Sequence, residues 1–201
     1  VNGNGDIEII PNCVDLSSYS EIQGEPEPSS LIFTGSFTYF PNHEAMVWFL
    51  GKVLPQIQTK LPNVQLKITG NHANKPLPKA DNVTLTGFVD DVRPLMRSAW
   101  VSVVPLHTGG GTRLKILEAM ALGTPVVSTS KGAEGLDVEA GRHLLIADSP
   151  ESFASEVVRL LEEPDLRKKL VTNAYQLVRE QYDWAVVLPR FLNLLEQTVH
   201  D

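Results

Sequence analysis

The sequence predicts an α/β fold in which helices cover both faces of a doubly wound parallel sheet of about six strands. Short, continuously apolar segments alternate along the chain with segments whose apolar residues recur at helical spacing. Four of the apolar segments end in glycine or proline followed by a loop. The 201 residues are also enough to form a core without disulfides or a structural metal.

The first elements are marked by proline and glycine. An apolar run at 7–10 predicts a short strand that ends at Pro11, and a segment rich in Glu, Pro and Ser then continues to residue 30. A compact strand follows at 31–34 and ends at Gly35. A helix opens at Pro41, and Pro55 bends or restarts it. Its apolar residues at helical spacing are Ala45, Met46, Phe49, Leu50 and Val53.

The rest of the chain repeats the same alternation. Further strands are expected at 64–69, 83–86, 100–104, 125–128 and 143–147. Helices are expected at about 91–97, 150–161, 165–181 and 184–199, besides one that follows a glycine turn near residue 110. We therefore divide the chain into an interdomain linker at 1–30, an α/β domain at 31–183 and a C-terminal helix at 184–201.

Composition excludes several classes of protein. The net charge of −7 argues against a nucleic-acid surface, which needs a basic patch. The single cysteine, Cys13, excludes an internal disulfide and a cysteine-based metal cluster, and the histidines lack metal-ligand spacing. There is no apolar run long enough to span a membrane, and a cytoplasmic location is expected. Because the chain opens at Val1 without Met, we expect a fragment of a longer protein.

The segment from Pro105 to Pro125 is the most informative one. Three glycines at 109–111 precede a ten-residue helix, for which the hydroxyl of Thr112 is a plausible N-cap. Gly123 suits the left-handed position after the helix, and Pro125 prevents its continuation.

Arg113 and Lys115 lie in the first turn of this helix, where the helix dipole already presents about half a positive charge. Cations are mildly unfavourable there unless an anion lies in front of the helix. The glycines would let the backbone approach such a ligand closely. This stretch therefore predicts a phosphate site.

Glu118 is the only carboxylate of the helix and lies one turn after Lys115. Because the helix is apolar nearly all round, a glutamate within it needs a partner. One interpretation is an ion pair with Lys115. The other is a carboxylate that accepts hydrogen bonds from paired sugar hydroxyls, as acidic residues do with ribose.

In a doubly wound sheet, ligands bind beside the carboxyl ends of the strands where the strand order reverses. The turn at Gly35 and the turn at 109–111 would face each other there. The dinucleotide fingerprint Gly-x-Gly-x-x-Gly is not present after the strand at 31–34, and the Gly-Lys-Ser/Thr of a phosphate-binding NTPase loop is not present after 109–111.

The segment 109–127, with the block Glu118-Ala-Met-Ala, resembles the signature of family 4 retaining glycosyltransferases of the GT-B fold, in their glycine-rich subgroup. Ile10-Pro-Asn-Cys-Val-Asp15, Gly35-Ser36 and Gly87-Phe-Val89 also fit that family, as does the late Tyr182-Asp-Trp184. The resemblance covers nearly the whole chain and implies the Rossmann-like donor-binding half of the enzyme. It further implies a missing N-terminal acceptor domain, against which the helix at 184–201 packs and which would carry any peripheral membrane association.

The resemblance also implies roles for single residues. Glu118 matches the second glutamate of the family's Glu-x7-Glu motif, which binds the nucleotide ribose. Arg113 and Lys115 would meet the diphosphate and stabilise it as it leaves. The backbone at Val89 would hold the base, and Gly35 and Ser36 would line the cleft toward the acceptor domain. The amides of Gly109, Gly110, Gly111 and Thr112 would face the donor sugar and phosphate.

Two positions depart from the family pattern. Gly110 stands where the first glutamate of the motif is expected, so sugar contacts must come from the backbone or from elsewhere. Cys13 replaces a glycine of the linker motif.

The function implied is transfer of a sugar from a nucleoside-diphosphate sugar to an acceptor hydroxyl with retention, and the arrangement requires no metal or other cofactor. The alternatives are a non-catalytic nucleotide or sugar-phosphate binding module and a GT-B sugar-nucleotide epimerase. The isolated fragment should bind its donor weakly and be inactive.

Overall fold

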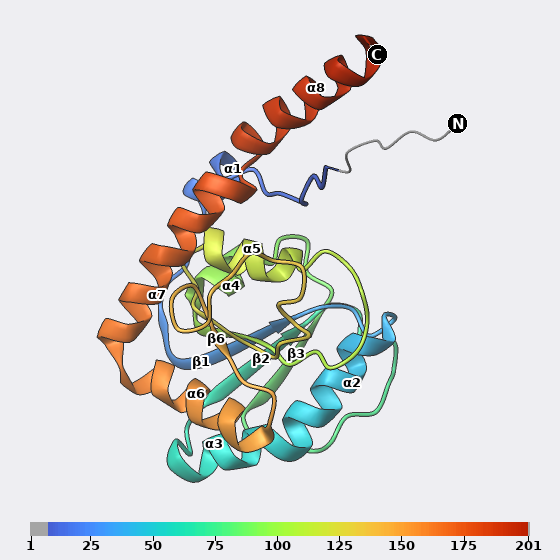
Figure 1. Ribbon diagram of the computed structural model, residues 1–201. Helices are drawn as coiled ribbons and strands as arrows, with labels where there is room; N and C mark the ends of the chain where they lie inside the picture. Colours follow the sequence, from blue (N-terminus) through green and yellow to red (C-terminus); the bar gives the residue numbers. More distant parts are fainter. Residues whose placement is uncertain (1–7, 201) are drawn as a thin grey trace.

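The computed structural model describes residues 8–200, with side chains described through residue 197. Six parallel strands form one sheet in the order β3-β2-β1-β4-β5-β6 (Figure 1). The strands are β1 (Glu27–Thr34), β2 (Gln65–Thr69), β3 (Val83–Gly87), β4 (Ala99–Val104), β5 (Val126–Ser128) and β6 (Leu145–Ile146). The strand order reverses between β1 and β4, as in doubly wound sheets. The predicted fold class is confirmed.

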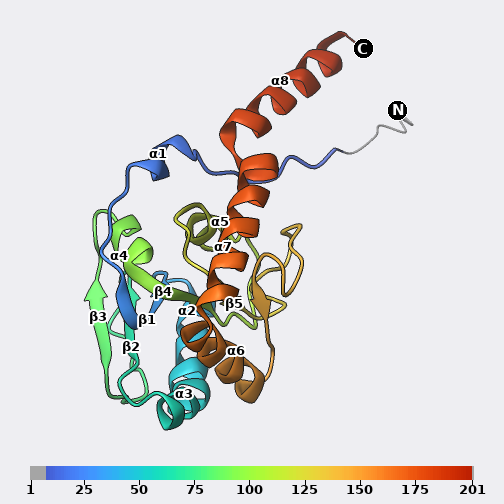
Figure 2. The same ribbon diagram turned by 90° about the vertical axis from the view of Figure 1, so that its left-hand side faces the viewer.

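Helices cover both faces of the sheet (Figures 1 and 2). One face is packed by α2 (Phe40–Trp48), the π-helical turn η1 (Phe49–Val53), α3 (Leu54–Lys60) and α6 (Pro150–Glu162). The other face is packed by α4 (Arg93–Ser98), α5 (Leu114–Ala121) and α7 (Pro164–Leu177). Two buried clusters result, because each face of the sheet has its own helical layer.

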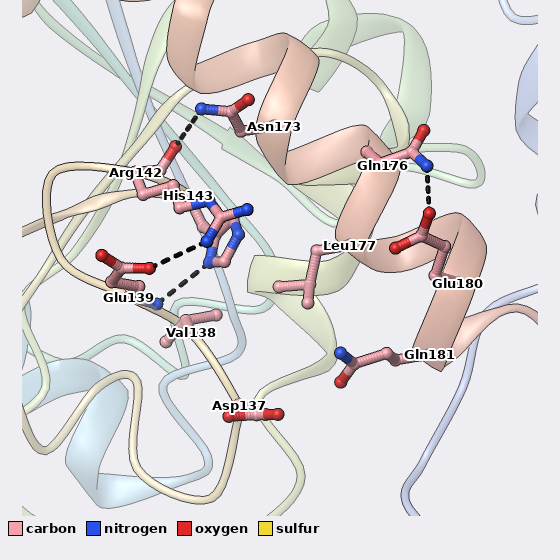
Figure 3. Close-up of a pocket in the computed structure, with 10 residues that line it drawn as sticks. All are labelled: Asp137, Val138, Glu139, Arg142, His143, Asn173, Gln176, Leu177, Glu180 and Gln181. Carbon is pink, nitrogen blue, oxygen red and sulfur yellow. Dashed lines mark hydrogen bonds and ion pairs between the residues drawn. The ribbon is translucent and has the colours of Figure 1, made fainter.

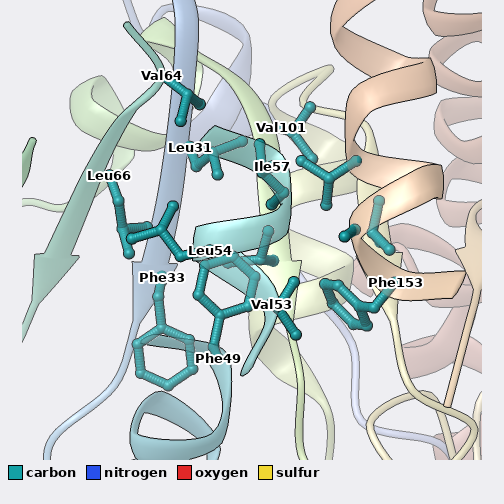
Figure 4. Close-up of a cluster of buried hydrophobic side chains, with 14 of the residues drawn as sticks. Leu31, Phe33, Phe49, Val53, Leu54, Ile57, Val64, Leu66, Val101 and Phe153 are labelled. Atoms are coloured by element: carbon teal, nitrogen blue, oxygen red, sulfur yellow. The ribbon is translucent and has the colours of Figure 1, made fainter. Parts of the chain in front are cut away.

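The first cluster is rich in aromatic residues (Figure 4). Phe153 of α6 is fully buried and meets Phe49 and Trp48 edge-on, with ring centroids 5.9 and 5.7 Å apart. Edge-to-face contacts of this kind add stability beyond the area buried. This layer fixes α2, whose N-terminal end lies at the carboxyl edge of the sheet.

Several boundaries differ from the sequence expectations. The strand expected at 31–34 begins four residues earlier, at Glu27, because Glu27 pairs with Ala99 of β4; its carboxylate also meets Lys67 of β2 at 2.5 Å. The strand expected at 143–147 shrinks to two residues. The helix opened by Pro41 restarts as α3, with Pro55 in its first turn, as expected.

The prediction of a strand at 7–10 is wrong for residues 8–10, which form no strand. Ile7 lies outside the described residues. Ile9 is 78% exposed, so this apolar run has no neighbouring strand to pair with. The linker is nevertheless attached to the domain further on. Val14 is buried and its amide donates to the Tyr182 carbonyl at 2.8 Å.

The chain ends in η2 (Val178–Tyr182) and α8 (Trp184–His200), and α8 extends away from the sheet (Figures 1 and 2). Its exposed apolar side chains include Trp184, Val186, Leu188, Phe191 and Leu192. Among the described residues, no helix combines the length and apolar character that crossing a bilayer requires.

Candidate functional site

The glycine turn leads into α5 as expected, but the helix begins later than expected. Gly109 and Gly111 have φ of 89° and 114°, a region that residues other than glycine rarely adopt. The N-cap is Arg113, with φ 9° and ψ 32°, and it is not Thr112. Because the backbone still turns at Arg113, α5 starts at Leu114, and no side chain caps it.

The other end of α5 is as predicted. Gly123 has φ of 71°, its amide donates to the Met120 carbonyl at 3.1 Å, and the Thr124 amide donates to the Ala119 carbonyl at 2.8 Å. These two bonds form a Schellman motif, and Pro125 follows it. The helix is therefore fixed at its C-terminus, while its N-terminal amides lack a capping side chain.

The turn after β1 and the glycine turn after β4 lie side by side, as expected from the strand order. The Tyr39 hydroxyl donates to the Gly110 carbonyl at 2.9 Å, and a Cβ at Gly109 would overlap the Tyr39 oxygen. A Cβ at Gly35 would lie 2.6 Å from Asn42 Nδ2. The two turns thus approach each other closely, and two of their glycines are required by that approach.

Asn42 joins the two turns, a role that sequence reasoning missed. Its Nδ2 donates to the Ser36 carbonyl at 2.9 Å, and its Oδ1 accepts from Lys115 Nζ at 2.9 Å. Asn42 is 7% exposed, although it lies in the first turn of α2. Sequence reasoning marked the opening of a helix here, at Pro41, and did not identify a link from Asn42 to Lys115.

Lys115 is partly buried and has only neutral partners. Besides Asn42, it contacts the face of Phe33, with Nζ 4.6 Å from the ring centroid. Among the ion pairs of the described residues, none involves Lys115. Burial, together with the charge of Arg113, lowers the pKa of Lys115 to about 8, with Glu118 opposing the shift. Lys115 therefore makes no direct ion pair, and the nearby Glu118 carboxylate compensates its charge only in part.

Arg113 lies beneath the glycine turn and is 7% exposed. Its guanidinium donates to the carbonyls of Lys131, Gly109 and Gly110 at 2.8, 3.3 and 3.4 Å. It also approaches the Glu134 carboxylate at 3.5 Å, while its Nε is buried without a hydrogen-bond partner. Arg113 therefore holds the shape of the turn and brings positive charge behind it.

Glu118 makes no ion pair with Lys115, so that interpretation of the sequence is wrong. Its Oε1 instead accepts a hydrogen bond from the Tyr19 hydroxyl, with the oxygens 3.4 Å apart. Burial raises the pKa of Glu118, and the Tyr19 bond and the charges of Lys115 and Arg93 oppose that rise. Tyr19 belongs to the short helix α1 (Ser17–Ser20) in the linker, and no sequence pattern marked it.

The remaining predicted residues lie at the same edge of the sheet. Ser36 Oγ donates to the Asn71 carbonyl at 3.2 Å and bonds Thr38 Oγ1 at 2.8 Å. Thr112 is exposed, and Val89 is partly buried two residues after the end of β3. The predicted site residues thus follow β1, β3 and β4, with Glu118 one turn inside α5.

A separate polar pocket of about 310 Å³ lies between the loop at 137–143 and the α7–η2 helices (Figure 3). None of its lining residues belongs to the predicted site. Three carboxylates line it, and its one arginine, Arg142, is already paired with Glu139 at 3.1 Å. This charge balance disfavours a diphosphate, so we do not place the donor there.

The chain is similar in sequence to proteins about twice its length. It is 32% identical over 202 residues to the phosphatidyl-myo-inositol mannosyltransferase of Mycolicibacterium smegmatis, covering 93% of this chain and 51% of that protein. It is 28% identical over 165 residues to an uncharacterised 44.6 kDa protein of the cps region of Klebsiella pneumoniae, covering 77% of this chain and 42% of that protein. The chain spans about half the length of the relatives it matches.

Solved structures share the fold at low sequence identity. Anabaena Alr3699/HepE in complex with UDP superposes with a TM-score of 0.76 at 17% identity, over 94% of this chain and 57% of that one. The C-terminal domain of a glycosyl transferase group 1 family protein (LpcC) from Francisella tularensis gives 0.63 at 19% identity, over 85% and 98%. These neighbours confirm the Rossmann-like half of a GT-B fold. Residues 28–163 match the family Glycosyl transferases group 1, and the chain belongs to that family.

Proposed function

We propose that this chain is the donor-binding half of a retaining, family 4 glycosyltransferase of the glycine-rich subgroup, which uses a nucleoside-diphosphate sugar. The diphosphate lies in front of the glycine turn and the uncapped N-terminus of α5. Glu118 accepts hydrogen bonds from the ribose hydroxyls, and the backbone at Val89 holds the base. Gly35 and Ser36 line the side of the site that faces the acceptor. UDP in the crystal structure of the Anabaena neighbour supports a nucleotide ligand.

The proposal rests above all on the unpaired charge of Lys115. A partly buried ammonium that meets only an amide oxygen and an aromatic face is incompletely compensated. A diphosphate would supply the missing negative charge and would also meet the free amides of α5. Arg113 adds a second positive charge from behind the glycine turn.

The chemistry follows from where the charge develops. The bond from the anomeric carbon to the diphosphate breaks, a bond to the acceptor oxygen forms, and the leaving diphosphate gains negative charge. Lys115, Arg113 and the helix amides stabilise that charge in a preorganised site, and they can take the part that a metal plays in other transferases. The acceptor and the remainder of the cleft are expected in the N-terminal half.

Calorimetric titration of the chain with UDP, GDP and ADP tests the assignment. The expected result is binding of one nucleotide that weakens at least about tenfold in Lys115→Ala and in Arg113→Ala, the loss of a charge-assisted bond. Lys169→Ala, which removes an exposed lysine on α7, is the matched control. Affinity that stays unchanged in Lys115→Ala, Arg113→Ala and Glu118→Ala would refute the site.

The full-length protein separates transfer from its alternatives. Incubation with the matching nucleotide sugar should yield a glycoside with the donor's anomeric configuration, read by NMR. An epimerised nucleotide sugar would identify an epimerase, and binding without any product would identify a non-catalytic module. We also propose that the exposed apolar side chains of α8 pack on the N-terminal half in that protein.

A further inference from the structure

Glu118 has a single hydrogen-bond partner among the described residues, and it comes from the linker. The Tyr19 hydroxyl donates to Oε1, while no bond reaches Oε2. Burial and the adjacent Glu118 raise the pKa of Tyr19 to about 12, so the phenol keeps its proton throughout the neutral range. Tyr19 is therefore a permanent donor to one oxygen and leaves the other oxygen open.

Tyr19 is itself held in place by α4. Arg93 donates to the Ser18 carbonyl at 2.9 Å and lies over the Tyr19 ring, with Cζ 5.8 Å from the ring centroid. The Asp91 carboxylate receives two bonds of 2.9 Å from the same guanidinium. The chain of contacts from Asp91 through Arg93 and Tyr19 to Glu118 thus joins the linker, α4 and α5.

We propose that Tyr19 is a positioning residue, which orients the Glu118 carboxylate so that it can accept hydrogen bonds from the two ribose hydroxyls of the nucleotide. This inference rests on the proposed function, because it assigns Glu118 to the ribose. Without the phenol, a carboxylate one turn inside a buried helix is free to rotate and loses a hydrogen bond to its charged form. The linker is then part of the nucleotide site and does more than connect two domains.

The test compares ligands with and without ribose hydroxyls on the 201-residue chain. The nucleoside diphosphate that binds wild type most tightly among UDP, GDP and ADP is titrated beside its 2′,3′-dideoxy analogue and beside inorganic diphosphate. In Tyr19→Phe, the ribonucleotide should bind about 3- to 10-fold more weakly, the usual effect of one hydrogen bond. The other two ligands should keep their affinity within about twofold, since neither reaches Glu118 through the two hydroxyls. Tyr175→Phe, on the exposed face of α7, is the control.

A pH series gives a second readout that a purely structural role would not change. The groups facing Glu118 are Tyr19, Lys115 and Arg93, and all three favour its ionised form. Binding of the ribonucleotide falls as pH drops through the pKa of Glu118, so removing the phenol should move this fall to higher pH. In a Glu118→Gln background, Tyr19→Phe should cause no further loss and no shift.

The outcomes separate the two proposals. If no nucleotide binds wild type, the proposed function fails. If wild type prefers the ribonucleotide and Tyr19→Phe keeps both that preference and the pH profile, the role of Tyr19 is refuted. Equal weakening of all three ligands in Tyr19→Phe would likewise overturn it, since that result shows a general disturbance of the domain.

Discussion

Burial of the Lys115 charge should destabilise the domain when no nucleotide is bound. Replacement of Lys115 by methionine should recover part of that stability. The difference between an ordinary lysine pKa of 10.5 and about 8 corresponds to about 3 kcal/mol, at 1.36 kcal/mol for each tenfold change. Methionine has a similar length and keeps the contact with Phe33. It also leaves Asn42 Oδ1 without a donor, which costs about 1 kcal/mol or more. We therefore expect Lys115→Met to gain about 1–2 kcal/mol at pH 7.

The direction in which the free energy of unfolding changes with pH follows from the protonation of Lys115. Below pH 8 the lysine is protonated in both the folded and the unfolded chain, so the full cost of burying the charge is present. Between about pH 8 and 10.5 the folded chain releases the proton while the unfolded chain keeps it, and the stability of wild type rises. The advantage of Lys115→Met should therefore shrink across this window.

Urea unfolding at pH 7, 8, 9 and 10 measures the effect, with exposed Lys60 of α3 changed to methionine as the control. The same variant should bind nucleoside diphosphate at least about tenfold more weakly at pH 7, since the cation is lost. A difference in stability that stays constant with pH, or a loss of stability at pH 7, would refute the argument that this charge is incompletely compensated.

Four further changes test the geometry of the two turns and of the core. Asn42→Asp supplies the missing carboxylate, so the pKa of Lys115 should rise toward 10.5 in NMR titration and nucleotide affinity should fall about tenfold. Gly35→Ala should cost about 1–3 kcal/mol in urea unfolding, because its Cβ would lie 2.6 Å from Asn42 Nδ2. Gly110→Ala, with nothing within 4 Å and no left-handed φ, should be neutral or stabilise by up to about 1 kcal/mol. Phe153→Ala should cost about 3–5 kcal/mol, since the side chain is fully buried among aromatic rings.

The sheet and the meeting of the two turns could be predicted because local signals determine them. Apolar runs that end in glycine or proline gave the strands, and parallel strands bring their carboxyl ends to one edge. Gly123 and Pro125 marked the end of α5 for the same local reason. The strand boundaries were less accurate, as the early start of β1 at Glu27, paired with Ala99 of β4, shows.

The partners of the predicted charges could not be read from the sequence. Lys115 and Asn42 are 73 residues apart, and Tyr19 and Glu118 are 99 apart. Such pairs leave no periodic signal, so the sequence offered only the nearer pairing of Lys115 with Glu118 as one of its two interpretations, and the structure contradicts that one. The burial of Arg113 beneath the glycine turn could not be predicted for a related reason. Its partners are backbone carbonyls, which every residue possesses.

Since Asn42 joins the turn at Gly35 to Lys115 and Tyr39 joins it to the turn at 109–111, the arrangement of the two turns cannot exist in a partly folded chain. Both contacts span more than 70 residues and need β4 already docked beside β1. Such distant contacts are costly to close and form late. A nucleotide that binds here would therefore select only completed molecules and, by mass action, protect them from unfolding.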